Sequence, residues 1–431
     1  MWAEIGAPCV SRRSILTLEG GHFCGGGIMT SNNFQELDPQ RIERLNRFRE
    51  EISYLQGDLD ATQERYGAAA DESEAALCCP VEYDRESLSH IPQDILDIDY
   101  GCGDPTVFAE EGQIVLDLGS GSGKHAFMIA KKVGPNGRVI GVDKTPAMLD
   151  KARAATAEVM ANLGYPKPMV EFRRGQIENL KIDIDDYVRL TEGRAIDNYD
   201  AVEAVERELE ACIMIPDESV DLVVSNCVLN LVDDQRKSQL MKEIYRVVKK
   251  TGSVAISDIV ADRPIPEHLK KDDHLWTGCL SGAFQWQDFH QAFAKVGFHG
   301  MTEAKSYFWQ RVEDINFYSV TILAYKGKVG PCYETYRSAL YTGPMSQVSD
   351  DDGHIFVRGK WERVCEKTAN LLSRPPYAGH FQVTPALEDV EKKIPFDCSP
   401  KATQDGFSSE MESRFQSALD EGACCEPGEC C

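Results

Sequence analysis

Residues 115–123, VLDLGSGSG, decide the fold that this 431-residue chain is expected to adopt. An apolar run that contains Asp117 leads into a turn rich in glycine, and the residues that follow, KHAFMIAKKVG, have the pattern of a helix. Glycines in such a turn let the backbone approach a ligand closely, at the positive N-terminus of the helix. The residues of the turn are Gly119, Ser120, Gly121 and Gly123.

A second acid strengthens the prediction of a nucleotide site. Asp143 ends the next apolar run, VIGVD, where a carboxylate can accept both hydroxyl groups of a ribose. Strand and helix patterns continue to alternate after it, which is typical of a doubly wound, mostly parallel sheet. We therefore expect a Rossmann-like α/β fold that binds its ligand beyond the carboxyl ends of the strands.

Composition narrows the class of protein. The formal net charge is -24, which repels phosphate backbones and anionic lipid headgroups, so we expect no nucleic-acid or membrane partner. No apolar run approaches the roughly 18 residues that a membrane helix needs, and we expect a cytoplasmic protein. The 15 cysteines are too sparse for a small disulfide scaffold, and most are expected to be small buried side chains.

Changes in composition and periodicity divide the chain into segments. An amphipathic helical pattern begins after Asp38 and Pro39, and an acidic, largely helical insertion interrupts the strand–helix alternation between the third and fourth strands. The predicted segments are a flexible leader (1–37), an N-terminal helical cover segment (38–112), the α/β domain (113–300) with its insertion (181–215), a smaller mixed α+β C-terminal domain (301–400) and a Cys-rich polar tail (401–431).

A few cysteines occupy positions where a ligand is expected. Cys227 follows the apolar run VDLVVSN, at the strand end where the acceptor of a doubly wound sheet should lie. Cys279 and Cys102 lie in glycine-bearing loops, and the adjacent pair Cys78 and Cys79 precedes a predicted helix that could fold over the site. A thiolate is a soft, polarizable group, unlike the acids and amides that orient oxygen or nitrogen nucleophiles.

The glycine turn resembles motif I of the class I S-adenosylmethionine-dependent methyltransferases. Its GxGxG pattern, preceded by an acid, differs from the GxGxxG pattern of dinucleotide-binding dehydrogenases. This resemblance implies that Asp117 lies near the amino end of the cofactor's methionine and that Asp143 holds the ribose. It also implies that Ile177 and Glu178, in GQIENL, lie at the adenine edge.

The cysteine motifs make the resemblance more specific. Together, IDYGCGDP, VVSNCVLNL and LWTGCLSGA are similar to the arsenite S-adenosylmethionine methyltransferases. The family implies that Cys102, Cys227 and Cys279 act as ligands of trivalent arsenic, and that Cys102 and one of the adjacent upstream pair supply the third thiolate or a reducing disulfide partner. Of that pair, Cys79 is preferred over Cys78. The cofactor-binding residues implied by the resemblance are Tyr100, Gly101, Asp117, Gly119, Ser120, Gly121, Gly123, Asp143, Lys144, Ile177 and Glu178.

The resemblance also implies partners and a reaction. S-adenosylmethionine would be the methyl donor, arsenite in the form of a thiol conjugate the acceptor, and thioredoxin or glutathione the reductant, with the chain acting as a monomer. Two other readings remain open from the residues themselves. One is a methyltransferase for a small organic metabolite, in which the cysteines are merely buried. The other is a non-catalytic, thiol-rich metalloid-binding protein, for which the terminal CCEPGECC is typical.

Overall fold

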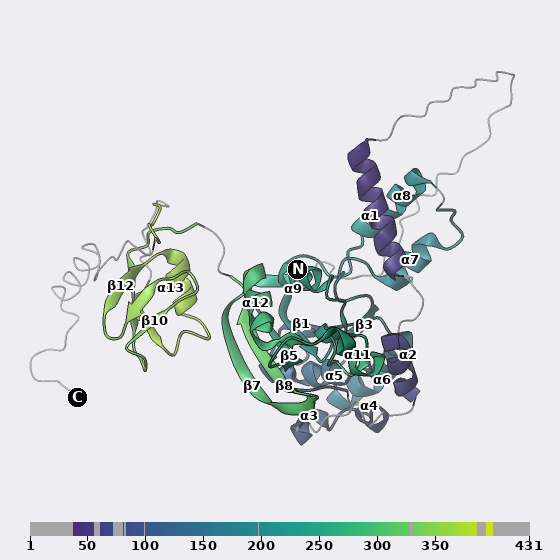
Figure 1. Cartoon of the computed structure of the whole chain (residues 1–431), viewed down its shortest axis with the longest axis horizontal. Coiled ribbons are helices and arrows are strands. Elements are labelled where there is room, and N and C mark those ends of the chain that lie inside the picture. Colours follow the sequence, from purple (N-terminus) through teal and green to yellow (C-terminus); the bar gives the residue numbers. More distant parts are fainter. Residues whose placement is uncertain are drawn as a thin grey trace, which may run out of the picture.

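The fold is described from a computed structural model of the chain (Figure 1). The structure describes residues 38–55, 61–71, 81, 83–98, 100–196, 198–327, 331–385 and 394–399. The predicted leader, the pair Cys78 and Cys79, and the Cys-rich tail therefore lie outside the described residues.

A large twisted sheet organises the chain, in the strand order β3-β2-β1-β4-β5-β8-β7 with β6 paired to β5. The first five strands of that order are mutually parallel, whereas β8 is antiparallel to β5 and β7 is antiparallel to β8. The mostly parallel, doubly wound sheet predicted from the sequence is thus confirmed. The strands are β1 (Ile114–Leu118), β2 (Arg138–Asp143), β3 (Val170–Arg174), β4 (Val220–Asn226), β5 (Val248–Ala261), β6 (Phe284–Gln285), β7 (His299–Val312) and β8 (Ile315–Tyr325).

Helices cover both faces of this sheet, which explains why its strands read as continuous apolar runs. Successive side chains of a strand point to opposite faces, so Leu116 and Leu118 join one buried cluster while Val115, which directly precedes Leu116, joins the other. The first cluster contains residues of α9 (Lys237–Val247) and α12 (Trp286–Val296), and the second contains residues of α5 (Lys124–Val133) and α6 (Pro146–Leu163).

The insertion and the N-terminal cover segment pack against each other. The insertion contains α7 (Ile184–Thr191) and α8 (Tyr199–Glu210), and these helices bury apolar side chains against the end of α1 (Pro39–Leu55) (Figure 1). Arg41 and Arg44 of α1 add ion pairs to Glu203 of α8. The other short helices are α2 (Ala61–Asp71), α3 (Arg85–Leu88), α4 (Gln93–Leu96), η1 (Pro105–Phe108), η2 (Leu229–Leu231), α10 (Glu267–Lys270) and α11 (Asp273–Thr277).

The predicted boundary between the α/β domain and the C-terminal domain, at residue 300, is wrong. The stretch FYSVTILAYKGK was assigned to a separate domain, but most of it is β8, which pairs with β5 from Ser253↔Tyr325 to Ala261↔Phe317. Strand β7 in turn pairs with β8 and lies at the edge of the same sheet. The alternation of strands and helices stops at this point because β7 and β8 form an antiparallel hairpin, which needs no crossover helix.

A smaller α+β unit follows the large sheet. Its strands form a three-stranded sheet, in the order β12-β9-β13, and a two-stranded sheet of β10 and β11. Buried aromatic and aliphatic side chains, among them Tyr341, Phe356 and Leu372, form its own apolar cluster. Its elements are β9 (Arg337–Tyr341), β10 (Gln347–Ser349), β11 (Ile355–Val357), β12 (Trp361–Val364), α13 (Glu366–Leu372) and β13 (Phe381–Val383).

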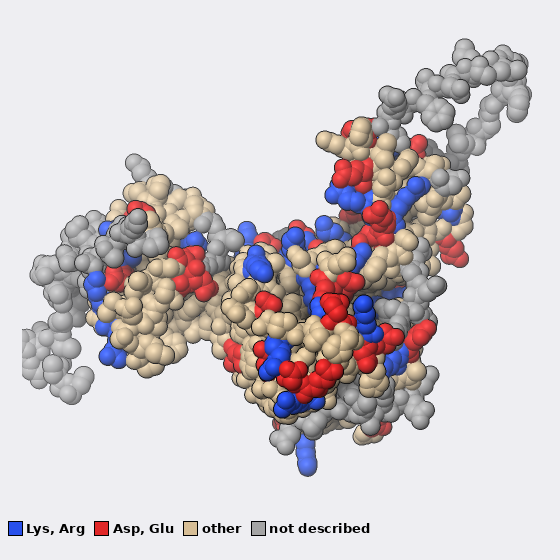
Figure 2. Space-filling model, viewed as in Figure 1, with Lys and Arg blue, Asp and Glu red and all other residues tan. Residues whose placement is uncertain are grey.

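The surface agrees with the composition. On the face shown in Figure 2, basic side chains are interspersed with acidic ones and form no large basic patch. Among the described residues, no helix is both long and apolar enough to span a membrane.

The place of β8 in the large sheet gives a stability prediction. Ile322 is fully buried and faces β5 at Ile256, so we expect Ile322→Ala to destabilise the large sheet by about 2–5 kcal/mol. Amide hydrogen exchange should accelerate in β1, β4 and β5. The matched variant Phe356→Ala, in the core of the small domain, should accelerate exchange there and leave the large sheet protected. Faster exchange confined to residues 331–385 in Ile322→Ala would contradict the assignment of β8.

Candidate active site

A cavity of about 460 Å³ lies at the carboxyl ends of the parallel strands. Ser120 lines it after β1, Asp143 at the end of β2, Ile177 after β3 and Cys227 after β4. This is the edge of the sheet at which ligands of doubly wound folds bind. Of the residues predicted to bind the cofactor, those that line the cavity are Tyr100, Gly119, Ser120, Gly121, Asp143, Lys144, Ile177 and Glu178.

The glycine turn has the backbone that its sequence suggested. Gly119 and Gly121 adopt φ angles of 70° and 50°, in the left-handed region that favours glycine. The amide of Gly121 donates a hydrogen bond of 2.9 Å to Asp143 Oδ2, so the turn after β1 is fastened to the end of β2. The Ser120 hydroxyl is buried without a hydrogen-bond partner among the described residues, and it faces a cavity that it lines.

Three predicted cofactor residues, Gly101, Asp117 and Gly123, do not line the cavity. A side chain at Gly123 would collide with Phe172, with its Cβ 2.7 Å from the ring, and one at Gly101 would lie 2.4 Å from the Asn226 side-chain nitrogen. These glycines allow the close packing of helix on strand and of turn on strand. They position the cavity wall, and they are not part of its lining among the described residues.

Asp117 carries the most unusual carboxyl group of the site. Its side chain is only 2% exposed, and Oδ2 has no hydrogen-bond partner within the described part of the chain. Burial, with a further contribution from the nearby charge of Asp143, raises the pKa of Asp117 to about 7. Such an unsatisfied buried acid is costly to the fold unless a donor or cation pairs with it. Together with Ser120 and the glycine turn, it fits a cofactor that brings an amino group.

The part of the cavity lined by Glu178 includes a residue that was not predicted from the sequence. Glu178 is buried, which raises its pKa, and its Oε1 accepts a hydrogen bond of 3.0 Å from the Tyr54 hydroxyl. Tyr54 belongs to α1, and the Arg236 guanidinium lies over its ring, 3.5 Å from the centroid. The N-terminal helix thus forms part of the wall, which no local motif around Tyr54 indicates.

The structure brings together the three cysteines predicted as arsenic ligands. Cys102 and Cys227 are joined by a disulfide bond, with their Cα atoms 5.9 Å apart. The Cys279 thiol donates a hydrogen bond of 2.9 Å to the carbonyl oxygen of Cys227. The three side chains belong to one apolar cluster. Of the three cysteines, only Cys227 lines the cavity. The fourth predicted thiol, Cys79, lies outside the described residues.

Backbone strain marks two of these cysteines. Cys227 has a φ of 59° and Cys279 a φ of 62°, in a region where side chains other than glycine are rarely found. Such residues persist only where the surrounding structure holds them, and they concentrate at functional sites. Here the holding bonds are Cys227 N–H to the Ser257 carbonyl and Cys279 N–H to the Trp276 carbonyl.

Buried polar side chains hold the thiol-bearing loops in place. The Asn226 Oδ1 accepts hydrogen bonds from the amides of Cys102 and Gly103, and its Nδ2 donates to the Gly103 carbonyl. Asn230 plays a similar part, because its Nδ2 donates to the carbonyl of Cys279. Neither asparagine was predicted, although both belong to the motif SNCVLN that was singled out for its cysteine.

Asp258 lies next to the disulfide between Cys102 and Cys227. It is fully buried, accepts hydrogen bonds from the amides of Leu229 and Ile259, and places an oxygen within 4.8 Å of the sulfurs of Cys102 and Cys227. Burial raises the pKa of Asp258 to about 7. The Asp258 carboxyl lies close to two sulfurs and can carry a proton near neutral pH. After Tyr54, it is the second residue whose importance was not recognised from the sequence.

His125 also lines the cavity. Its Nε2 lies 3.1 Å from both the Tyr83 hydroxyl and the Asn226 side-chain nitrogen. Burial, with the nearby charge of Lys124, lowers the pKa of His125 to about 4, so the ring is neutral at pH 7. It therefore serves as a hydrogen-bonding part of the cavity wall.

The N-terminal cover segment closes the acceptor end of the site. Tyr66 of α2 lines the cavity, and the charge of Cys279 contributes, after burial, to raising the pKa of its hydroxyl. Its ring meets that of Tyr100 edge to face, with centroids 5.9 Å apart, and the Tyr100 hydroxyl donates to the Ala69 carbonyl. Helix α2 therefore lies beside Cys279. It precedes the pair Cys78 and Cys79, so it is not the helix that was expected to fold over the site.

Comparison with known proteins decides the family. Residues 109–297 match the family described as "Methyltransferase domain", and residues 328–412 match one described as a domain of unknown function. An arsenite methyltransferase of Mus musculus is 31% identical over 315 residues, which cover 70% of this chain and 75% of the relative. The chain belongs to the arsenite methyltransferase family.

Two further members of this family support the assignment. The arsenite methyltransferase of Homo sapiens is 30% identical over 318 residues, covering 71% of this chain and 76% of that protein. The crystal structure of an arsenic (III) S-adenosylmethionine methyltransferase from Chlamydomonas reinhardtii is 29% identical, with a TM-score of 0.51, and the match covers 77% of this chain and 100% of that one. The family predicted from the cysteine motifs is confirmed.

The Asp117 carboxyl, whose Oδ2 has no hydrogen-bond partner among the described residues, predicts how the stability of the chain depends on pH. Its pKa rises from 3.8 in an ordinary setting to about 7 in the fold, so the folded chain loses stability as pH rises through this interval. Asp117→Asn removes the titration, and we expect it to stabilise the free protein more at pH 8 than at pH 5. At about 1.4 kcal/mol per pH unit, the gain at pH 8 is at most about 4 kcal/mol.

Urea unfolding at the two pH values measures this difference. The matched control is Asp262→Asn. Burial raises the pKa of the Asp262 carboxyl, but hydrogen bonds from Arg263 and Asn316 outweigh this effect and lower the pKa below its ordinary value. The carboxyl is therefore ionised at both pH values, and Asp262→Asn should destabilise the chain equally at pH 5 and pH 8. Equal effects of Asp117→Asn at both pH values would show that Asp117 is paired in solution.

Proposed function

We propose that this chain transfers methyl groups from S-adenosylmethionine to thiolate-bound trivalent arsenic, giving methylated arsenicals in arsenic detoxification. The observation that carries the proposal is the meeting of Cys102, Cys227 and Cys279 at the acceptor end of a cavity built around a nucleotide-type glycine turn. Membership of the arsenite methyltransferase family supports the same substrate.

The residues around the glycine turn would hold S-adenosylmethionine. Asp143 would accept the ribose hydroxyls, Ile177 and Glu178 would border the adenine, and the unsatisfied Asp117 oxygen would attract the amino group of the methionine. Tyr100, Lys144 and the turn residues Gly119, Ser120 and Gly121 complete the lining. When bound, the cofactor supplies an electrophilic methyl group on a sulfonium sulfur.

The thiols would bind and aim the substrate. Trivalent arsenic favours soft thiolate ligands, and three of them form a pyramid that leaves the arsenic lone pair pointing outward. Cys227 is placed to direct this lone pair toward the donor, because it belongs both to the thiol cluster and to the cavity wall. Positioning dominates such a displacement, with the reacting atoms on the order of 3 Å apart, and little acid–base catalysis is needed.

The disulfide between Cys102 and Cys227 supports a reducing role for the same thiols. Gain of a methyl group on its lone pair makes arsenic formally pentavalent. Two bound thiolates that leave as a disulfide return an electron pair to arsenic and restore the trivalent state, so the S–S bond is the oxidised product. Thioredoxin or glutathione would then regenerate the thiols by exchange. Cys79 is proposed as a further thiol in this relay.

The remaining assignments follow from this chemistry. Because turnover depends on reduced thiols, we propose that the chain works in the reducing cytoplasm, on arsenite delivered as a thiol conjugate. We propose a monomer, since residues of one chain supply both the donor cradle and the three thiols.

The decisive experiment is a methylation assay with variants. Purified chain, S-adenosylmethionine, thiol reductant and arsenite should yield mono- and dimethylated arsenic. Cys227→Ser and Cys279→Ser should each lower the rate by more than about 100-fold while cofactor affinity is retained, because a misplaced acceptor loses reactivity and not donor binding. The control Val188→Ser, on the exposed side of α7, should be unaffected.

Each rival function predicts another result. A methyltransferase for an organic metabolite keeps its turnover in both cysteine variants and makes no methylated arsenic. A non-catalytic metalloid-binding protein binds arsenite but gives no product even with intact cofactor binding. Either outcome would overturn the proposal.

The role of Cys102 gives a separate kinetic prediction. If it is the disulfide partner and not an indispensable ligand, Cys102→Ser should complete a first methyl transfer in a single-turnover experiment but stall afterwards. Rapid-quench analysis against the wild-type chain, with excess thioredoxin, measures both phases. Loss of the first transfer would instead make Cys102 the third arsenic ligand, and sustained turnover would remove it from the cycle.

A further inference from the structure

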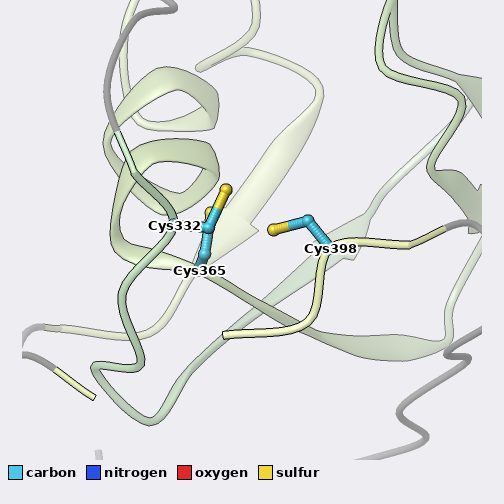
Figure 3. Close-up of side chains that lie close together, drawn as sticks. All are labelled: Cys332, Cys365 and Cys398. Atoms are coloured by element: carbon cyan, nitrogen blue, oxygen red, sulfur yellow. The ribbon is translucent and has the colours of Figure 1, made fainter. Parts of the chain in front are cut away.

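A second group of cysteines lies in the C-terminal domain, apart from the large sheet. Cys332, Cys365 and Cys398 are free thiols, and their sulfur atoms all lie within 4.8 Å of one another. Figure 3 shows the Cys398 sulfur pointing toward the sulfurs of Cys332 and Cys365. The sequence analysis treated all three as scattered, buried cysteines, and the proposed methyl transfer does not use them.

The three sulfurs come from segments that are far apart in the chain. Backbone hydrogen bonds hold these segments together. The Phe396 amide donates a hydrogen bond of 2.9 Å to the Cys332 carbonyl, and Tyr333 forms a β-bridge with Pro395. The Glu366 amide, next to Cys365, donates to the Tyr333 carbonyl. The thiols are therefore brought together by the fold, and their proximity does not depend on a chance orientation of surface side chains.

The setting favours thiolate ligands. Cys365 is fully buried, while Cys332 and Cys398 are half-buried, so solvent reaches the group at these two thiols. The Cys365 sulfur accepts a hydrogen bond from the Thr368 amide and lies 3.3 Å from the Thr368 hydroxyl. Donors aimed at a sulfur stabilise its charged form, which is the form that binds soft ions.

The number of ligands decides which ion fits. Structural zinc sites are almost always four-coordinate, and among the described residues no fourth acid, histidine or cysteine joins this group. The nearest histidine in the hydrogen-bond network, His354, is already engaged, with Nδ1 2.7 Å from Asp350 and Nε2 3.1 Å from the Cys398 carbonyl. Three sulfurs without a fourth ligand match a trivalent, thiophilic centre that forms a three-sided pyramid.

We propose that Cys332, Cys365 and Cys398 form a second binding site for inorganic trivalent arsenic, separate from the methyl-transfer centre. Binding is an exchange of ligands without oxidation. Three As–S bonds form, three As–O bonds of arsenous acid break, and the three thiol protons leave with the three hydroxides as water. The site goes beyond the proposed methylation, because it requires neither the donor nor the thiols of the large cavity.

Site-resolved alkylation of the full-length, reduced chain tests this proposal. The chain is treated with arsenite and then briefly with N-ethylmaleimide, and modification of each cysteine is measured by peptide mass spectrometry. Arsenite should slow modification of Cys332 and Cys398 by about tenfold or more, and that of Cys365 as far as the reagent reaches this buried thiol. Phenylarsine oxide, whose As–C bond leaves only two positions for sulfur, should protect two of the three thiols per chain.

Variants separate a shared site from independent thiols. Cys332→Ser should remove most of the arsenite protection of Cys398, and Cys398→Ser that of Cys332, because each leaves a two-sulfur site. Met345→Ser, an exposed residue of the same domain, is the matched control and should leave protection unchanged. Both half-buried positions tolerate serine more readily than Cys365 does, and circular dichroism checks that each variant is folded.

Three results would overturn the proposal. The first is modification of the trio that is insensitive to arsenite. The second is protection of one thiol that survives substitution of the other two, and the third is one zinc ion per molecule at these thiols that arsenite does not displace. None of these results would bear on methylation at Cys227 and Cys279, which is measured in a separate assay.

Discussion

The site depends on one side chain, Asn226 at the end of β4. Its amide oxygen accepts two backbone N–H groups of the Tyr100–Gly103 turn and its amide nitrogen donates back to the same turn, so three hydrogen bonds fasten this turn to the sheet. The fit is tight, because a Cβ at Gly101 would lie 2.4 Å from the asparagine nitrogen, and one at Gly103 would lie 2.5 Å from the Ser257 hydroxyl. Only a turn with glycines on both sides of Cys102 brings its sulfur within bonding distance of Cys227.

Sequence predicted those features that arise from local pattern. Strands, helices and the glycine turn have periodicities or backbone demands that a few neighbouring residues reveal, and Asp143 could be placed because it directly ends a strand. The hairpin of β7 and β8 was assigned to another domain because antiparallel strands carry no alternating helix, although they complete the same sheet. Its contribution to the site, Ser319 and Tyr307 donating to the Cys102 carbonyl, was equally beyond local pattern.

Convergence of distant side chains was the part that sequence could not provide. The family resemblance pointed to Cys102, Cys227 and Cys279. Only tertiary packing brings Tyr54 and Tyr66 to the cavity and Asp258 to the disulfide. The grouping of Cys332, Cys365 and Cys398 could not be predicted for the same reason. These cysteines lie singly in the chain and come together through tertiary structure such as the bridge between Tyr333 and Pro395. Sulfur-bearing residues were thus predictable where a known motif surrounds them, and unpredictable where the fold alone assembles them.

The β-bridge between Tyr333 and Pro395 also bears on the folding stability of the C-terminal domain. A few backbone hydrogen bonds hold segment 394–399 to the C-terminal domain. Cys398 belongs to this segment, and its sulfur points toward those of Cys332 and Cys365. The three sulfurs meet only when the domain is folded, so an atom bound by all three binds the folded form and not the unfolded chain. Because a ligand that binds only the folded form shifts folding by mass action, the supply of the metalloid would set how firmly this end of the domain is fastened.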